Sequence, residues 1–266
     1  MKITDFSYGE NNRKLSDFGF IVCHFDSGGL DTVSNGAVVS FNTVPAQNGA
    51  QHYLTSSTYE DCLETTIQIC KNPCGNDNME IDITTFRELT RWLCRRRFLR
   101  FKPISEEYID LYHEAIISVS RIELDSKLVG LELEIKTNRP FSLREKKTIR
   151  IENTEQDGTH SINDISHEEG YIYPHTEITI SQDGNLSIYN AIEDRTTYIA
   201  NCKQGEVITM DYPVIQSSDS SHNIQNDFNW SFFRVANTYD NSRNDLTISL
   251  PCSIKIEYSP IVKVGL

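Results

Sequence analysis

Three clusters of side chains in this 266-residue sequence could carry chemistry, and the first is a pair of cysteines. Cys70 and Cys74 lie four residues apart in CKNPCG, a spacing that could serve zinc. A structural zinc site needs four ligands, and the sequence offers neither a second close cysteine pair nor a histidine pair at ligand spacing. We therefore interpret both thiols as small side chains at a strand end and a turn, and expect no metal there.

The second cluster combines three histidines with three carboxylates: His160, His167, His175, Asp164, Glu168 and Glu169. Imidazoles and carboxylates are common metal ligands, but these spacings match no familiar ligand pattern. An acidic linker explains the composition equally well. No pair of carboxylates suited to hydrolysis and no nucleophile with its base is recognisable in the sequence. We therefore predict that the protein is not an enzyme and has no catalytic residue, metal or cofactor.

The third cluster consists of five arginines interleaved with aromatic residues: Arg91, Trp92, Arg95, Arg96, Arg97, Phe98, Arg100 and Phe101. Basic and aromatic side chains together can bind nucleic acid. Nothing around this cluster extends the basic patch, so nucleic-acid binding is the weaker interpretation. We predict that Arg95, Arg96 and Arg97 are contacts between protein subunits and that they face protein.

The charge of the chain is unevenly spread along the sequence. The net charge is -13; residues 1–150 hold 19 basic and 21 acidic residues, whereas residues 151–266 hold 6 basic and 17 acidic residues. This break predicts a boundary between a first domain at 1–145 and a second at 146–266. It also argues against nucleic acid or an anionic membrane as a partner of the second half, because both would be repelled.

The ends and the apolar segments of the chain give no sign of a membrane or of secretion. No window approaches 18 uncharged apolar residues, so we predict no transmembrane helix and no membrane partner. The start, MKITDFSYGENN, lacks the apolar segment of a signal peptide. Seven cysteines without such a signal indicate reduced thiols in a protein made in a cytoplasm.

One helix is predicted in the first domain, over the segment TTFRELTRWLCRRR. Thr85 and Glu88 have the spacing of a capping box, which predicts the start of the helix. Four apolar residues share one helical stripe that would dock on a sheet: Phe86, Leu89, Trp92 and Leu93. We place Arg95–97 in the last turn, where the helix dipole favours cations.

Strands are predicted for most of the remaining sequence, so the fold class is mainly β. In the first domain they include residues 15–26, 35–42 and 59–71, and a β-hairpin at 112–137. That hairpin could add a strand to the sheet edge of a neighbouring subunit. The second domain has evenly spaced short strands and no helical period, which predicts an antiparallel β-sandwich.

One of those strands, FNWSFFRVA at 228–236, allows two interpretations. Phe228, Trp230 and Phe232 alternate as core residues of a strand do. Alternatively, Trp230 with Asn229 and Arg234 could form an exposed platform that binds a saccharide. The last segment, YSPIVKVGL at 258–266, also leaves two options, since it could complete the sandwich or return to the first domain.

The order of these parts resembles a known family, the distal tail proteins (Dit) of long-tailed, non-contractile phages (siphoviruses) and prophages. The resemblance covers essentially the whole chain and is carried by five segments: KLSDFGFIV (14–22), FRELTRWLCRRRF (86–98), the run at 106–142, the run at 178–211 and the run at 244–266. It depends on the order of elements and on scattered apolar anchors, not on a single diagnostic motif.

The resemblance implies an N-terminal β-sandwich or split-barrel domain with one helix and an extended β-hairpin, followed by a galectin-like, or carbohydrate-binding-module-like, β-sandwich. It further implies a virion structural protein at the tail tip. Six copies of the chain would form a ring that joins the tail tube protein to tail-tip, baseplate or receptor-binding proteins. DNA would pass through the ring only as transient cargo. The alternative function is a module that recognises cell-wall saccharide during host adhesion.

Overall fold

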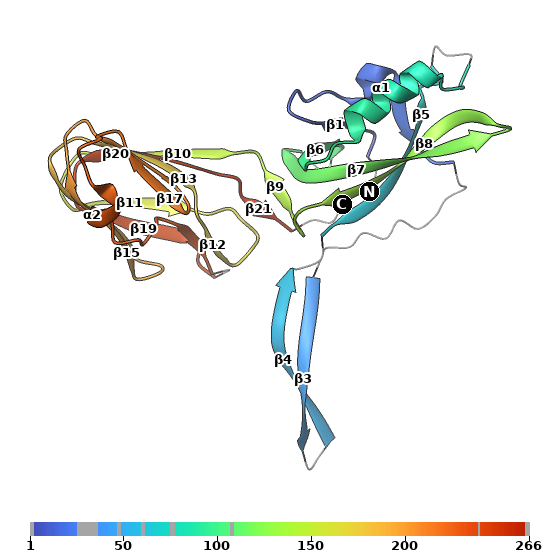
Figure 1. The fold of residues 1–266 in the computed structure, drawn as a ribbon. Coiled ribbons are helices and arrows are strands. Elements are labelled where there is room, and N and C mark those ends of the chain that lie inside the picture. The colour runs from blue at the N-terminus through green and yellow to red at the C-terminus, as the bar shows by residue number, and fades with distance from the viewer. Residues whose placement is uncertain are drawn as a thin grey trace. The chain divides into compact units, whose positions relative to one another are not determined.

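The computed structural model describes residues 3–25, 37–46, 49–59, 62–74, 78–106, 109–238 and 240–263, and for 37–46 and 49–59 it describes the backbone. Antiparallel strands make up most of the described chain, which confirms the mainly β fold class (Figure 1). The chain divides into two compact units, the first extending to Leu143 and the second spanning Arg144–Val262. In the described residues, no helix is long and apolar enough to cross a bilayer.

The first unit is built on one antiparallel sheet. Its strands follow the order β1 (Asp5–Tyr8), β6 (Leu99–Ile104), β7 (Leu111–Leu124), β8 (Lys127–Thr137), β5 (Glu64–Lys71) and β2 (Phe20–Cys23), and β9 (Ser142–Arg144) also pairs with β7. Leu131, Leu133 and Ile135 of β8 are completely buried, whereas Glu132 and Glu134 are not. This alternation follows from the two-residue period of a strand, which places every second side chain in the core.

The helix α1 (Ile83–Leu93) covers the core side of this sheet and contacts β7. Leu89, Trp92 and Leu93 are buried, so the predicted apolar stripe forms the docking face. A short 3-10 helix, η1 (Leu15–Phe18), occupies part of the region that we had predicted to be a strand at 15–26.

Both predicted ends of the helix were wrong. The carboxylate of Asp82 accepts hydrogen bonds from the backbone N–H groups of Thr84 and Thr85, so Asp82 is the N-cap in place of the predicted Thr85. Aspartate is among the best N-caps because its oxygen satisfies N–H groups that have no partner within the helix. These bonds, led by that of Thr85, lower the pKa of Asp82. The helix ends at Leu93, so Arg95–97 lie beyond its last turn.

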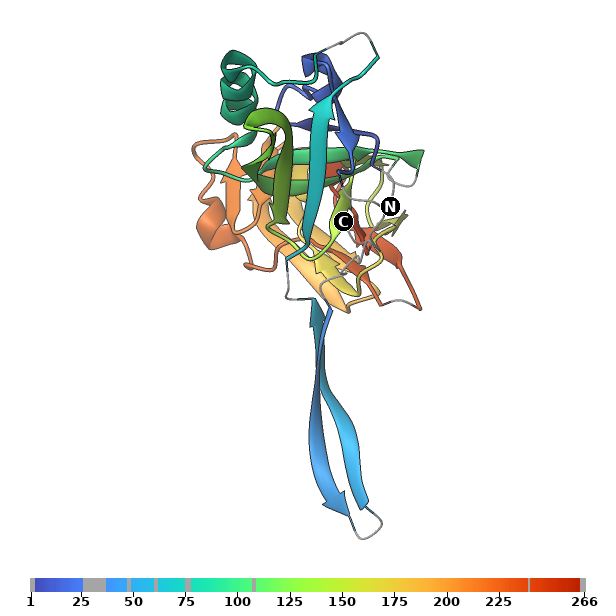
Figure 2. The same cartoon turned by 90° about the vertical axis from the view of Figure 1, so that its right-hand side faces the viewer.

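The predicted hairpin at 112–137 exists as β7 and β8, but it lies in the middle of the sheet between β6 and β5. A second hairpin, β3 (Ala37–Ala46) with β4 (Gly49–Tyr59), forms a two-stranded sheet of its own (Figures 1 and 2). Its strands pair from Ala37 and Tyr59 to Ala46 and Gly49. The separate extended ribbon is therefore β3–β4, and only its first strand was partly predicted, at 35–42.

The second unit is a sandwich of two antiparallel sheets. The five-stranded sheet has the order β10 (Lys147–Asn153), β20 (Cys252–Tyr258), β13 (His175–Ile180), β16 (Val207–Asp211) and β17 (Val214–Ser217). The four-stranded sheet has the order β11 (Gly158–Asn163), β19 (Arg243–Ile248), β14 (Gly184–Asn190) and β15 (Arg195–Cys202). Isoleucines such as Ile178, Ile188 and Ile254 fill the core between them, which confirms the predicted sandwich.

Three smaller elements complete the second unit. They are the paired strands β12 (Gly170–Ile172) and β18 (Val235–Asn237) and the one-turn helix α2 (Ile224–Asp227). The segment after β20 contains β21 (Ile261–Val262), which pairs with β9. Thus Tyr258 belongs to the sandwich, and the chain beyond it leaves the sandwich sheets.

A buried ionic cluster lies beside α2. The ring of His222 has Nδ1 at 2.6 Å from Glu206 Oε1 and Nε2 at 3.3 Å from Asp227 Oδ2. The side chains of His222 and Glu206 are 2% and 0% exposed. The backbone N–H of Lys203 and the hydroxyl of Ser217 also donate to Glu206. A carboxylate thus lies near each ring nitrogen, and the contact of Nδ1 with Glu206 is a hydrogen bond.

A buried histidine in the first unit has the opposite environment. His113 on β7 is 1% exposed, and its Nε2 lies 3.1 Å from Ser142 Oγ. Burial lowers the pKa of His113 from 6.5 to about 4, because the charged imidazolium would lose its hydration. The folded protein therefore holds this ring neutral.

Removing the Glu206 charge should destabilise the second unit. We expect Glu206→Gln to lower the free energy of unfolding by about 2 kcal/mol, because one of the two carboxylate oxygens that accept buried hydrogen bonds would become an amide nitrogen, which cannot accept them. Denaturant unfolding followed by circular dichroism measures the change. The exposed Glu169→Gln serves as control and should stay within about 0.5 kcal/mol of the parent chain. Equal effects of the two substitutions would contradict a stabilising ionic cluster.

His113 should make the protein less stable in acid. Its folded pKa lies below the unfolded value, so the unfolded chain binds more protons between pH 6.5 and about pH 4. The stabilising contribution is complete above pH 6.5 and is lost as the pH falls to about 4, by up to about 3 kcal/mol. We expect His113→Gln to reduce this pH dependence in urea unfolding at pH 7 and pH 4.5. The exposed His24→Gln should leave it unchanged.

Candidate functional site

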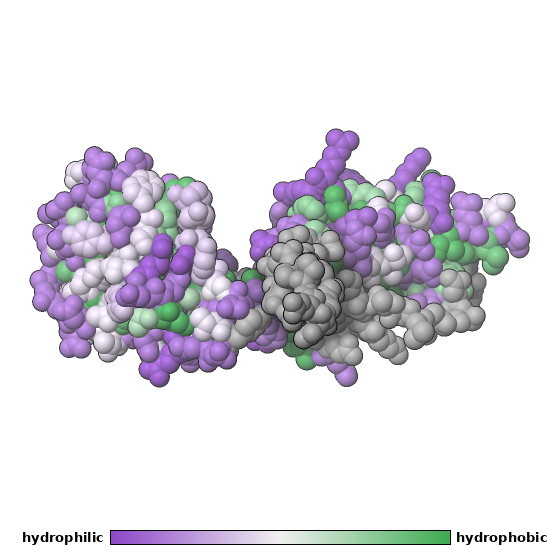
Figure 3. All heavy atoms as spheres, turned by 90° about the horizontal axis from the view of Figure 1, so that it is seen from below, coloured by the Kyte–Doolittle hydropathy of each residue, from purple (hydrophilic) through white to green (hydrophobic). Residues whose placement is uncertain are grey.

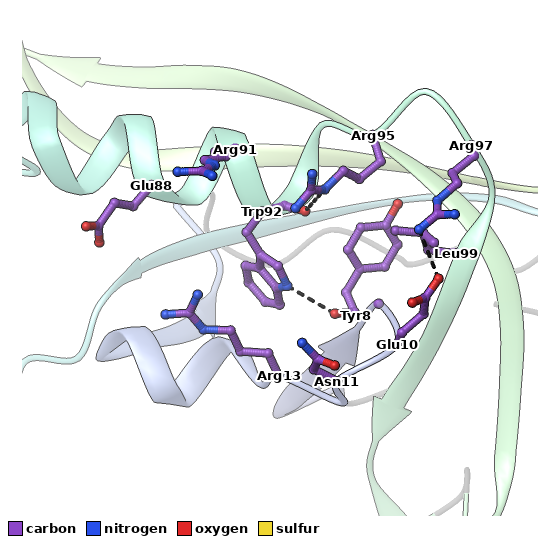
Figure 4. Close-up of a pocket in the computed structure, with 11 residues that line it drawn as sticks. Tyr8, Glu10, Asn11, Arg13, Glu88, Arg91, Trp92, Arg95, Arg97 and Leu99 are labelled. Atoms are coloured by element: carbon purple, nitrogen blue, oxygen red, sulfur yellow. Dashed lines mark hydrogen bonds and ion pairs between the residues drawn. The ribbon is translucent and has the colours of Figure 1, made fainter.

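A pocket of about 510 Å³ opens between α1, the segment after it and the segment that follows β1 (Figure 4). Its charged lining consists of four arginines and two glutamates: Arg13, Arg91, Arg95, Arg97, Glu10 and Glu88. The pocket therefore carries two positive charges in excess. We call it the arginine pocket.

Trp92 forms the wall of the arginine pocket and connects the elements around it. The indole N–H donates to the backbone oxygen of Tyr8 at 3.0 Å. The indole ring also stacks on Phe6 with centroids 5.7 Å apart and on Phe18 with centroids 4.7 Å apart. One side chain of α1 thereby contacts both β1 and η1, and it fixes the distance across the pocket.

Three of the four arginines are held in place by one contact each. The Arg13 guanidinium lies 3.8 Å from the ring centroid of Phe18, and Arg95 Nε donates to the backbone oxygen of Trp92 at 3.2 Å. Arg97 pairs with Glu10 at 2.9 Å, and both side chains are mostly exposed. Arg91 makes no hydrogen bond or ion pair with the described residues.

Tyr8 lies beneath these arginines and is not an acid–base group. Its hydroxyl donates to the backbone oxygen of Ala115 at 3.2 Å. Burial raises the pKa of Tyr8 to about 12, although the charge of Arg95 acts in the opposite direction. The hydroxyl is thus a neutral hydrogen-bond donor.

The three arginines that we predicted to act together line two neighbouring features. Arg95 and Arg97 line the arginine pocket, whereas Arg96 does not. Arg96 lines a shallow groove together with Arg95, Ser118, Glu134 and other residues of β7 and β8. Their contact with a neighbouring subunit stays a prediction.

The second unit carries a surface of aromatic side chains. Trp230, Tyr212 and Tyr171 are 58%, 56% and 55% exposed. Tyr173 stacks on Tyr212 with centroids 4.1 Å apart and meets Tyr171 edge to face. Phe232 lies behind this group and contacts both Tyr212 and Trp230. We call these residues the aromatic surface.

The interpretation of 228–236 as a core strand was wrong for most of its length. Only Val235–Asn237 is a strand, and Trp230 has a left-handed backbone with φ 58°. Phe228 and Phe232 are buried as predicted, but the backbone reversal turns Trp230 outward. A residue with positive φ breaks the alternation on which the core interpretation depended.

The two predicted neighbours of Trp230 have structural contacts of their own. Asn229 accepts hydrogen bonds from the backbone N–H groups of Tyr198 and Ser231 and donates to the backbone of Thr196. Arg234 pairs with Glu193 at 2.6 Å, and its guanidinium lies 3.7 Å from the centroid of the Tyr171 ring. Asn229 therefore connects the segment around Trp230 to β15, and the guanidinium of Arg234 packs against the ring of Tyr171.

The histidines grouped in the sequence at 160–175 make separate contacts in the structure. His160 contacts Asn153, and His175 lies 3.8 Å from Asp211. The described residues contain no group of three or more histidine, cysteine or acidic residues that could hold a metal. Cys70 is buried and Cys74 is exposed, and all seven cysteines are free thiols.

The face of the molecule in Figure 3 is mostly hydrophilic over both units, and its apolar areas are small and separate. Two local features of the described residues could recognise a partner. They are the arginine pocket of the first unit and the aromatic surface of the second.

Comparisons with known proteins identify the family. A family model described as a phage tail protein N-terminal domain matches residues 1–139, and one described as a phage tail C-terminal domain matches residues 141–258. No curated protein sequence matches the chain.

A solved structure shares the fold. It is the crystal structure of the Dit protein of phage SPP1, described as a paradigm of the hub adsorption apparatus in phages that infect Gram-positive bacteria. The two are 11% identical, with a TM-score of 0.63 over 97% of this chain and 99% of the other. The chain belongs to a family of phage tail proteins and has the fold of a Dit protein.

Proposed function

We propose that this protein is a distal tail hub of a long-tailed phage or prophage. The observation that carries the proposal is the shared fold, which extends over nearly the whole length of both this chain and the SPP1 hub protein. A likeness confined to one unit would be compatible with an adapter domain of another kind. The role is structural, with no catalytic residue and no cofactor.

In this role, six copies form a ring at the tip of the virion tail. One side of the ring contacts the tail tube protein, and the other contacts tail-tip, baseplate or receptor-binding proteins. DNA crosses the ring as cargo. The boundary between a ring-forming first domain, at 1–145, and an outer domain, at 146–266, agrees with the division into two units near Leu143.

The first unit supplies elements suited to ring contacts. An isolated two-stranded hairpin such as β3–β4 is marginally stable in water, so a partner for its strands would stabilise it. β6 pairs with β7 only at residues 113–115, whereas β8 follows β7 to Leu124. Among the described residues, the β7–β8 hairpin therefore extends beyond β6. Cys94 hydrogen-bonds the backbone of Val119 on this stretch of β7, and strand addition to the remaining edge is a common mode of association.

The ring can be tested by imaging. We expect negative-stain electron microscopy of the purified chain to show rings with a central hole, and light scattering to give about six times the monomer mass. A monomer at high concentration, both alone and with the tail tube protein present, would contradict the hub role.

A shortened β3–β4 ribbon serves as the matched variant. Replacing residues 43–52 with the two-residue turn Asn-Gly removes whole cross-strand pairs and keeps Asn42 opposite Tyr53. The first unit should keep its circular dichroism spectrum while the rings are lost. Rings that persist would show that the ribbon is dispensable for assembly.

A second candidate function, saccharide binding, is favoured by the exposure of Trp230. Sugar rings stack on exposed aromatic faces, and Trp230, Tyr212 and Tyr171 offer three. The predicted polar partners Asn229 and Arg234 would act indirectly, because both hold parts of the aromatic surface in place.

Saccharide binding can be tested with cell walls. If it occurs, the full-length chain should sediment with purified cell walls of the host, and Trp230→Ala should reduce the bound fraction about tenfold. Phe98→Ala, which removes an exposed ring of the first unit, is the control and should bind normally. Equal sedimentation of the parent chain and the Trp230 variant would exclude the aromatic surface as a saccharide site.

A further inference from the structure

The arginine pocket has positive charge that its own residues do not neutralise. Arg13, Arg91 and Arg95 form no ion pair within the described residues, and the one ion pair of the pocket joins Arg97 to Glu10. The side chains of that pair are 70% and 74% exposed, so the pair is weak and an incoming anion can displace Glu10.

Two of these arginines, Arg13 and Arg95, are also held in position before any ligand arrives. Stacking on Phe18 holds Arg13, and the bond from Nε to the backbone of Trp92 holds Arg95. In Figure 4 the side chains of Arg13 and Arg95 lie on opposite sides of the Trp92 ring. Guanidinium groups bind carboxylates through paired N–H donors, and positioning them in advance reduces the entropy lost on binding.

The shape and charge of the pocket fit carboxylates better than a nucleic-acid backbone. A nucleic-acid site needs a basic track that follows many phosphates. Here Glu10 and Glu88 interrupt the basic lining, and the four arginines line one pocket. A short acidic segment can place two or three carboxylates in such a space, and the walls formed by Trp92 and Leu99 can contact its aliphatic carbons.

We infer that the arginine pocket binds an acidic segment of a protein. The inference deepens the hub role and rests on it, because a hub must hold other polypeptides. A second copy of this chain is one source of such a segment, since residues 151–266 hold 17 acidic residues against 6 basic ones. Another tail protein is the other source of the same chemistry.

Trp92 offers a direct readout of the pocket. The chain has two tryptophans, so Trp230→Phe leaves Trp92 as the sole indole. We expect its fluorescence to change on titration with a hexaglutamate peptide, with an affinity that weakens as salt is added. A 12-base-pair DNA duplex should bind less tightly than the peptide. Calorimetry on the unsubstituted chain checks that Trp230→Phe has no effect of its own.

The matched variants differ only in which arginine is removed. Arg95→Gln and Arg97→Gln should each weaken hexaglutamate binding roughly tenfold, because each removes charge-assisted hydrogen bonds to the ligand. Arg96→Gln is the control, since Arg96 lies between them in the sequence but does not line the pocket. It should change the affinity less than about twofold.

Three results would overturn the inference: no binding of hexaglutamate, tighter binding of DNA than of the peptide, or an equal loss in all three variants. Ring formation is measured separately, so failure of the hub role and failure of the pocket can be told apart. If the double variant that carries Arg95→Gln and Arg97→Gln also fails to form rings, the acidic segment comes from a second copy of the chain. If the rings persist while peptide binding is lost, it comes from another protein.

Discussion

The position of Trp92 is the constraint on which the first unit depends. Its ring stacks on Phe6 and Phe18, and its N–H reaches the backbone of Tyr8. A large aromatic side chain in such a place typically contributes several kcal/mol through burial, and here it also connects a helix to a sheet edge. The same side chain forms the inner wall of the arginine pocket, so the stability of the fold and the geometry of that pocket have a common origin.

The two units differ in how they bury their cores and in how they distribute charge. The first buries one helix and one 3-10 turn against a single sheet, and it keeps a nearly balanced charge. The second encloses its core between two sheets and places most of its excess negative charge on the outside. An acidic, solvated sandwich resists non-specific association, whereas the remaining edge of β7 and the separate ribbon leave the first unit able to pair.

Local patterns predicted much of this fold. The alternation of Leu131, Leu133 and Ile135 defined β8, and the apolar stripe of α1 defined its buried face. The predicted start of α1 was wrong because aspartate and threonine are both good N-caps. Only the folded backbone selects Asp82 over Thr85. The half of the arginine pocket that follows β1 could not be predicted from the sequence either. Glu10, which pairs with Arg97, lies 87 positions earlier in the chain, and no local pattern connects the two residues. The interpretation of Trp230 as a core residue was wrong because strand periodicity carries no information about a residue with a left-handed backbone.

Trp230 also bears on how this family would change over time. A non-glycine residue at φ 58° costs roughly 1 kcal/mol, and a ring that is 58% exposed regains little of that cost through burial. Glycine or asparagine would suit the backbone better. In any lineage whose tails no longer need this ring, mutational drift should replace it quickly. An aromatic residue retained at this position among distant relatives would therefore record continuing selection for a contact that the isolated chain does not make.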